Sequence, residues 1–469
     1  MVGLSVVAHA QTCNDIIGRV SNDNPFFRRF STYKQPAPRW RRWLGAAVGL
    51  LALAFIIYNV PFVHDRLAWR VDEFVTGISR WVKPPQEAIF IPAEPVALPT
   101  RAATATPSEE QASPTPFPTF EPLPTSVKLE GFTFVTQQGR WNYCGPSTLA
   151  MALNYWGWDG DRDDVAAIVK PGEDNQSMDF IERGRKDLNV MPYEMENFVN
   201  EYSDVRALTR IGGDLEVVKR LIANGFPVVI EKGYYEADYR GIIDWLGHYL
   251  FVTGYDEERG AFIVQDTWDK NHPGENVDSP YDEFIAGWRS FNYLFIVVYP
   301  PEREQEVIDL LGPWADSEWA NRHAFEIAVR ETEELAGIDA FFAWFNKGSS
   351  HVALFEYVDA ANAYDYAFQL YSALDETTYN RPYRMMWYQT GPYWAYYYSA
   401  RYQDVINLAN VTLSTPKEPT LEESIYWRGM ARRAIGEIDN AVADFQQTVY
   451  LNPNFSPGWA MLEELGVSP

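Results

Sequence analysis

The chain has 469 residues, of which 46% are hydrophobic and 22% are charged. This length predicts about three domains, and the composition excludes a disordered protein and a membrane protein with many spans. The net charge of −25 excludes a nucleic-acid-binding protein, because such proteins need a basic surface. The two cysteines are too few for a disulfide scaffold or a structural four-cysteine zinc site. We expect neither a cofactor nor a metal ion.

Residues 43–63 form an uncharged apolar stretch of 21 residues. Since about 20 apolar residues cross the hydrocarbon core as a helix, this stretch predicts one transmembrane helix. A buried core helix and a cleaved signal peptide are the alternatives, but the stretch is long for both. The 15 residues before it carry six Lys or Arg, and the 15 after it carry two. By the positive-inside rule, residues 1–42 form a cytoplasmic tail and the remainder lies outside the cell membrane.

The next two segments connect the apolar stretch to the globular part. Residues 64–83 place apolar side chains at helical spacing, which predicts an amphipathic helix on the membrane surface or an ordinary stalk helix. Residues 84–126 contain eleven prolines together with Ser, Thr and Ala. Such a composition favours an extended chain and cannot bury a core, so we expect a linker that spaces a globular head away from the membrane.

The first globular domain, residues 127–302, has the short apolar runs and helices of an α+β fold. Its most informative stretch is the Cys-Gly-Pro-Ser run at 144–147, which opens a helical pattern that ends at Gly157. Pro146 suits the first turn of a helix, where its missing N–H costs nothing. Cys144 therefore lies at a helix N-terminus, where the partial positive charge lowers the pKa of a thiol.

A lone cysteine is more commonly a small buried apolar residue than a nucleophile. Since the expected topology leaves Cys13 in the cytoplasm, Cys144 is the single cysteine outside, without a disulfide partner in the chain. A lone thiol in an oxidising compartment is a liability unless it is buried or used. Both interpretations of Cys144 are open at this point.

His248 and Asp266 lie on two neighbouring strand patterns. Residues 248–255 and 261–266 are apolar runs with strand character, and a polar turn separates them. A hairpin folded about residue 257 sets His248 directly opposite Asp266, where the carboxylate can orient the imidazole. The prediction depends on the register, because a slip of one residue places the two side chains on opposite faces.

Other residues are alternatives in these two roles. His272, in a loop pattern, is an alternative base, and Asp269 is an alternative acid. His248 is itself open to another interpretation, as a strand-end histidine that bonds to the backbone. The hairpin favours the pair formed by His248 and Asp266 over these alternatives.

Four pieces of this domain occur in an order that resembles a known family. They are Gln138, the Cys-Gly-Pro run at 144, the Gly-His-Tyr run at 247 and Asp266. The set resembles the bacteriocin-processing (double-glycine) cysteine peptidases of bacteria, and above all their stand-alone C-thirty-nine-like relatives. The resemblance covers residues 127–302 and implies a papain-like fold.

The resemblance also implies a catalytic role for each piece. Cys144 matches the nucleophile, His248 the general base and acid, and Asp266 the residue that orients the imidazole. Gln138 matches the donor of the oxyanion hole, with Gln137 as the alternative donor and the backbone N–H of Cys144 as a second one. The implied reaction is attack on a peptide carbonyl to give an acyl-thioester that water hydrolyses. The sequence shows no ATPase loop, so the likeness extends to the reaction type and not to a double-glycine leader substrate.

Residues 313–469 carry the spacing of helical repeats. The stretch 422–455 has small, aromatic and proline residues at positions that resemble a tetratricopeptide repeat of 34 residues. The residues that carry this pattern are Gly429, Ala441, Phe445 and Pro453. Weaker units begin at residues 341 and 386, so we expect an irregular all-α solenoid of three units, about the minimum that buries a continuous core. A plain helical bundle is the alternative.

These patterns together predict a membrane-anchored, extracytoplasmic cysteine peptidase with a tetratricopeptide-like tail. Its partners are a peptide or protein substrate, the membrane and a protein held by the repeats. The aromatic run at 387–398 is expected in the core of the repeats, with a groove for peptides or partner helices as the alternative. A binding module without turnover is the rival function. An acyltransferase that uses the same nucleophile is the third possible function.

Overall fold

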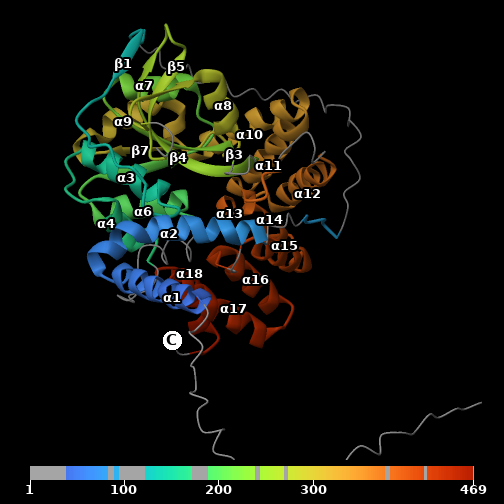
Figure 1. Cartoon of the computed structure of the whole chain (residues 1–469). Coiled ribbons are helices and arrows are strands. Elements are labelled where there is room, and N and C mark those ends of the chain that lie inside the picture. The colour runs from blue at the N-terminus through green and yellow to red at the C-terminus, as the bar shows by residue number, and fades with distance from the viewer. Residues whose placement is uncertain are drawn as a thin grey trace, which may run out of the picture. The chain divides into compact units, whose positions relative to one another are not determined.

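A computed structural model (Figure 1) describes most of the chain. The described residues are 39–82, 89–93, 122–171, 189–237, 243–268, 273–374, 381–416 and 420–467. The chain divides into two compact units, Met1–Leu67 and Ala68–Pro469. The second unit contains the α+β domain and, after it, an all-helical region.

The apolar stretch at 43–63 is divided between two helices. Helix α1 spans Arg39–Tyr58, and α2 spans Pro61–Val82. Pro61 lacks an N–H and disfavours helical backbone at the residue before it, so the first helix cannot continue through this point. The expectation of one unbroken transmembrane helix is therefore wrong.

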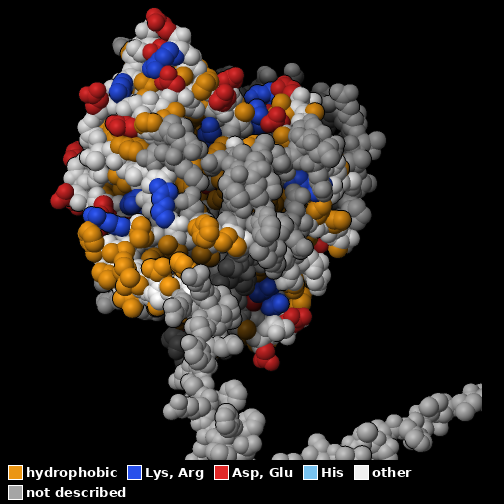
Figure 2. Space-filling model, in the orientation of Figure 1, with side chains coloured by type: hydrophobic (Ala, Val, Ile, Leu, Met, Phe, Trp, Pro, Cys, Tyr) orange, Lys and Arg blue, Asp and Glu red, His pale blue; other side chains and the backbone are white. Residues whose placement is uncertain are grey.

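The lengths and compositions of the helices can be compared with what a membrane span requires. Within the described ranges, no single helix is both long and apolar enough to span a membrane. One pair, Trp43–Tyr58 with Phe62–Ala68, passes the same test together and is bent by 94°. The side chains of Leu50, Leu51 and Phe55 on α1 are 67%, 71% and 69% exposed, and hydrophobic side chains gather over this helix in Figure 2.

The α+β domain is built on an antiparallel sheet of seven strands. Six strands follow the order β2-β7-β3-β4-β5-β6, and β1 pairs with β4. The strands are β1 (Ser126–Lys128), β2 (Arg206–Arg210), β3 (Val228–Ala237), β4 (Ile243–Asp256), β5 (Ala261–Asp266), β6 (Val277–Pro280) and β7 (Phe295–Tyr299). The longest strands, β3 and β4, therefore lie in the middle of the sheet.

Helices cover both faces of this sheet (Figure 1). On one face, α3, α4 and α6 pack against Val229, Phe251 and Ile296. On the other face, α7, α8 and α9 pack against residues of alternate parity, such as Ile230 and Leu250, as the two-residue period of a strand requires. The helices are α3 (Cys144–Tyr155), α4 (Arg162–Val169), α6 (Pro192–Tyr202), α7 (Leu215–Ala223), α8 (Tyr281–Arg289) and α9 (Glu304–Leu311).

The hairpin of β4 and β5 forms as the sequence predicts, but with a different register. Asp266 pairs with Leu250, and the register shifts by one residue between Val252 and Gly254. His248 therefore lies two residues beyond the position opposite Asp266. Because this offset is even, the two side chains still share one face of the sheet, as diagonal neighbours.

The region after β7 is helical. Its α-helices are α10 (Ser317–Glu334), α11 (Gly337–Ala353), α12 (Tyr357–Ala373), α13 (Met385–Tyr388), α14 (Gly391–Tyr398), α15 (Tyr402–Ser414), α16 (Glu422–Ala434), α17 (Ile438–Leu451) and α18 (Ser456–Glu464). A Cβ atom on Gly348 of α11 would lie 2.7 Å from the Tyr364 ring of α12, and one on Gly429 of α16 would lie 2.8 Å from the Phe445 ring of α17. Each glycine thus lets the two helices of a pair approach closely.

The α+β domain and the helical region share one hydrophobic core. Trp245 of β4 and Phe291 after α8 belong to the same buried cluster as Phe341 and Phe345 of α11. Polar contacts join the two parts as well, including the bond from Asn292 Nδ2 to Ser350 Oγ at 3.0 Å. The helical region is therefore packed on the domain as part of a single folded body.

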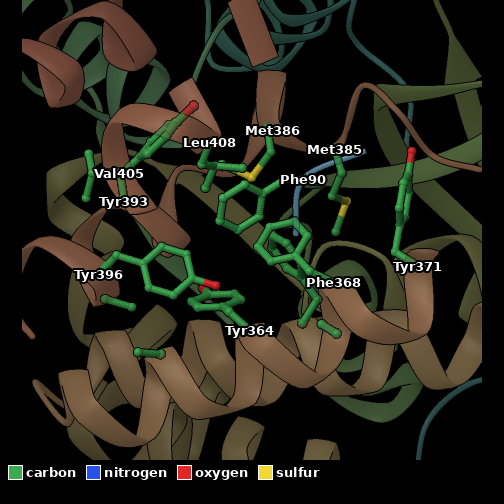
Figure 3. Close-up of a cluster of buried hydrophobic side chains, with 14 of the residues drawn as sticks. Phe90, Tyr364, Phe368, Tyr371, Met385, Met386, Tyr393, Tyr396, Val405 and Leu408 are labelled. Atoms are coloured by element: carbon green, nitrogen blue, oxygen red, sulfur yellow. The ribbon is translucent and has the colours of Figure 1, made fainter. Parts of the chain in front are cut away.

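Phe90, which lies in the expected linker, is buried in the helical region. Its ring lies 5.0 Å from that of Phe368 and 5.9 Å from that of Tyr396, measured between ring centroids. Figure 3 shows it within the aromatic cluster of the helices. The backbone N–H of Ala93 donates to Asp404 Oδ1 at 2.9 Å. This part of the proline-rich segment is thus held by the fold and does not behave as a free spacer.

We predict that Phe90→Ala lowers the free energy of unfolding by about 3 kcal/mol, because it empties a buried aromatic site. The matched control is Ile91→Ala, at a side chain that is 72% exposed, for which we expect a change within about 0.5 kcal/mol. Denaturant unfolding of the full chain measures both. Equal effects of the two substitutions would show that the segment does not pack on the helices.

Candidate active site

Cys144 is the first residue of α3, as the sequence predicts. The helix ends at Tyr155, and Gly157 follows with a positive φ of 87°. Cys144 is partly exposed, whereas the next nine residues of the helix are buried. The buried face of α3 thus fixes the helix in the domain while its first side chain stays within reach of a reactant.

Cys144, His248 and Asp266 form a continuous chain of hydrogen bonds. His248 Nε2 lies 2.8 Å from Asp266 Oδ1, and the imidazole also forms a hydrogen bond with the Cys144 thiol. Since Nε2 faces the carboxylate, Nδ1 is the ring nitrogen left to face the sulfur. The two strands and the helix therefore bring together the three residues that the sequence predicts.

The charges of these groups shift their pKa values in opposite directions. Burial raises the pKa of Cys144, but the hydrogen bond and charge of His248 and a backbone hydrogen bond from Tyr249 outweigh burial and lower it overall. Burial lowers the pKa of His248, but the charge and hydrogen bond of Asp266 outweigh burial and raise it from 6.5 to about 10. Both shifts favour the form of the pair in which Cys144 is a thiolate and His248 an imidazolium.

Asp266 is held in place by the backbone around it. The backbone N–H of Trp268 donates to Asp266 Oδ1 at 2.8 Å, and the N–H of Asp266 donates to the carbonyl of Gly274 at 2.8 Å. The carboxylate thus binds the imidazole from a fixed position. His248 is 5% exposed, so solvent competes little for this bond.

The two glutamines before Cys144 have different environments. Gln137 Oε1 accepts a hydrogen bond from Thr267 Oγ1 at 3.3 Å, and Gln137 is buried. Gln138 Nε2 is buried and has no hydrogen-bond partner among the described residues. A buried donor without a partner costs free energy unless a ligand binds it. Of the two glutamines, Gln138 is therefore the one with a donor free to bind an oxyanion.

The loop that carries Gln138 is tied down by a residue that the sequence did not single out. Arg162, at the start of α4, donates from Nη2 to the carbonyl of Gln138 at 3.2 Å and from Nη1 to the carbonyl of Thr136. The N–H of Gln137 also bonds to the carbonyl of Thr267 at 2.8 Å. No motif marks Arg162, because its role depends on a loop 24 residues away.

Glu231 is a second group near the sulfur that sequence reasoning missed. It is 2% exposed on β3, where it pairs with Tyr249. Burial raises the pKa of Glu231 well above its ordinary range, and the Cys144 thiolate raises it further. The raised pKa disfavours a second negative charge on Glu231 near the Cys144 sulfur. The signal in the sequence was a lone acid inside an apolar strand.

His272 and Asp269 fall outside the described residues. No group of three or more His, Cys, Asp or Glu that could hold a metal ion occurs in the part of the chain that the structure describes. The hydrogen-bonded arrangement of Cys144, His248 and Asp266 can carry out the chemistry of a cysteine nucleophile with an adjacent base.

Comparison with known proteins finds a family match for part of the chain. Residues 130–296 match the Peptidase_C39 like family. These residues form a C39-like α+β domain, and the helical region follows it. A search of curated proteins finds no match.

Two solved structures are similar to parts of the chain. One is described as a C39-like peptidase from Bacillus anthracis, at 19% sequence identity and a TM-score of 0.28, with 37% of this chain and 96% of that chain covered. The other is xylellain, a cysteine protease from Xylella fastidiosa, at 18% identity and a TM-score of 0.27, with 46% of this chain and 98% of that chain covered.

Proposed function

We propose that the chain is a cysteine peptidase in which Cys144, His248 and Asp266 form the catalytic triad. The observation that carries this proposal is the hydrogen-bonded chain from thiol to imidazole to carboxylate, with His248 Nε2 2.8 Å from Asp266 Oδ1. A buried structural cysteine has no need of such a chain. The match of residues 130–296 to a C39-like peptidase family supports the same reaction class.

The mechanism follows from the protonation states of the pair. The Cys144 thiolate attacks the carbonyl carbon of a peptide bond, and the proton on His248 Nδ1 passes to the leaving amine as the C–N bond breaks. The acyl group then remains on sulfur as a thioester. Neutral His248 next takes a proton from water, and the resulting hydroxide attacks the thioester and releases the acid. The proton on His248 and the thiolate are thereby restored.

Gln138 is the proposed side-chain donor of the oxyanion hole. Its Nε2 is buried without a described partner, and Arg162 fixes the carbonyl of the same residue. A donor held in place before the reaction needs no reorganisation when negative charge develops on the substrate oxygen. The backbone N–H of Cys144, at the start of α3, is the second donor.

We propose in addition that the protein is held at the cell membrane with its domain on the extracytoplasmic side. The exposed apolar side chains of α1 support membrane insertion, and the bent pair Trp43–Tyr58 with Phe62–Ala68 has the composition for it. The excess of basic residues before residue 43 supports the orientation.

The helical region is proposed to be an irregular tetratricopeptide-like array that binds a protein partner. Helices α11–α12, α14–α15 and α16–α17 fall on the three units that begin at residues 341, 386 and 422. The close glycine–aromatic contacts in the first and third pairs occur at equivalent positions of the units. This equivalence favours a repeat over an unrelated bundle.

Alkylation by iodoacetamide tests the ion pair. Because the thiolate is the reactive form, the pH at which the rate is half-maximal follows the pKa of Cys144. We predict a midpoint below that of an ordinary cysteine, which rises in His248→Ala, since burial then acts without the imidazolium. At neutral pH that variant should react at least about tenfold more slowly. The midpoint of Asp266→Asn should lie between those of the wild type and His248→Ala. Identical profiles in all three proteins would contradict the ion pair.

Peptide cleavage tests the reaction. We expect the full chain to cleave members of a peptide library and Cys144→Ala to lose all cleavage, because no nucleophile remains. The wild type should also release product with water as the acceptor. Transfer of the acyl group to an added amine, without hydrolysis, would indicate an acyltransferase. Slow alkylation of Cys144 together with no cleavage would indicate a binding module.

The two glutamines form a matched pair for testing the oxyanion hole. We predict that Gln138→Ala lowers kcat by about 100-fold or more, the usual cost of a lost oxyanion donor. Gln137→Ala removes a hydrogen bond to Thr267 and should change kcat by less than about tenfold while lowering thermal stability. The reverse order of the two effects would assign the donor to Gln137.

A further inference from the structure

Tyr388 of the helical region lies against the strand that carries His248. It is the last residue of α13. A Cβ atom built on Gly247 would lie 3.1 Å from both Cγ and Cδ1 of Tyr388, so the ring packs directly on the backbone of β4. Gly247 immediately precedes His248, and Tyr388 is 140 residues away in sequence. The helical region thus reaches the candidate active site.

Contacts to the α+β domain anchor α13 on two sides. Asn189 Nδ2 donates to the carbonyl of Trp387 at 2.6 Å. Gln389 Nε2 donates to the carbonyl of Ser290 at 2.6 Å. The residues on either side of Tyr388 are therefore bonded to different segments of the domain, which fixes the position of the tyrosine between them.

Aromatic contacts fix the ring itself. The Tyr388 ring lies 5.9 Å from Trp245 and 6.0 Å from Phe291, both in edge-to-face geometry. The hydroxyl group forms a hydrogen bond with the backbone of Gly247, and burial raises the pKa of Tyr388, with a further contribution from the Cys144 thiolate. The hydroxyl is therefore neutral, and it accepts from the Gly247 N–H beside the reactive pair.

The sheet itself supports this part of β4 on one side alone. Strand β3 pairs with β4 from Ile243 to Val252, whereas the pairing with β5 begins only at Leu250. His248 thus lies on a stretch where β5 has ended. A catalytic imidazole must be held to within about half an ångström, and Tyr388 provides support that the sheet does not.

We propose that Tyr388 is a positioning residue of the active site, which acts through Gly247 on the imidazole of His248. The helical region then completes the catalytic centre in addition to binding a partner. The proposal rests on the proposed function, since the group that Tyr388 positions is the proposed general base. Removal of the ring should displace His248 and weaken both its bond to Cys144 and its proton transfer.

The test compares three variants of the full chain. Tyr388→Ala removes ring and hydroxyl, Tyr388→Phe keeps the ring, and Tyr450→Ala is the matched control at a tyrosine of α17 that is 56% exposed. We expect Tyr388→Ala to lower kcat at least about tenfold with little change in KM and to raise the pH midpoint of Cys144 alkylation. Tyr388→Phe should restore most of kcat, within about fivefold of the wild type. Tyr450→Ala should match the wild type.

The pH midpoint separates positioning from a structural role. If Tyr388→Ala merely destabilises the fold, the stability of the protein falls but the folded fraction keeps the wild-type pH midpoint of Cys144 alkylation. That result would overturn the proposal. If Tyr388→Ala does not fold, Tyr388→Leu, which also removes the aromatic ring, takes its place, and an unchanged kcat and midpoint in Tyr388→Leu would overturn the proposal. The pH midpoint of alkylation can be measured without peptide cleavage, so it tests the role of Tyr388 even if the wild type cleaves no peptide. Failure to cleave peptides would count against the peptidase proposal alone.

Discussion

The structure depends on the hydrogen bonds that join Cys144, His248 and Asp266. Each residue comes from a different element: the start of α3, the middle of β4 and the end of β5. The bond between His248 and Asp266 is 2.8 Å long and keeps the imidazole charged beside the sulfur. Burial alone would neutralise both members of the cysteine–histidine pair, because it disfavours charge on each. The carboxylate therefore favours a thiolate at this largely desolvated site, because it keeps the charge on His248.

The residues around Cys144, His248 and Asp266 favour the charged forms of the three side chains. Glu231 on β3 is buried, and burial raises its pKa well above the ordinary range, which disfavours a second negative charge near the thiolate. Arg162 donates to two carbonyls of the glutamine loop and holds the loop in place, and Gln138 Nε2 has no partner among the described residues. The helical region adds its own constraint, since it shares a core with the domain through Trp245 and Phe291. These contacts make the domain and the helices one structural unit around one site.

The sequence predicts the parts of the site that depend on local pattern. Pro146 and the apolar spacing after Cys144 predict the helix that carries the thiol, and the runs on both sides of residue 257 predict the hairpin. The register was wrong, because the shift between Val252 and Gly254 and the length of the turn leave no local signal. The prediction of a shared face was right, since the offset of two residues preserves the alternation of side chains.

Other features could not be predicted, because they depend on contacts between distant segments. Phe90 lies in a segment whose prolines indicate a linker, yet it packs among helices that begin more than 200 residues later. Tyr388 belongs to an aromatic run expected in a core, and nothing local links it to Gly247. The sequence does contain a signal for the helix break before Pro61, since proline disfavours helical backbone at the preceding residue. The apolar composition of 43–63 outweighed that signal in the prediction.

The proposed catalysis depends on an ion pair between Cys144 and His248 in the resting protein. Its most direct test is a pH titration of the thiolate by its ultraviolet absorbance, taken as the difference between wild type and Cys144→Ala. We predict that the thiolate signal appears at a pH below the pKa of a free cysteine, while His248 is still protonated, because the raised pKa of His248 keeps the imidazolium beside the sulfur. A thiolate that appears only at or above the pKa of a free cysteine would contradict it.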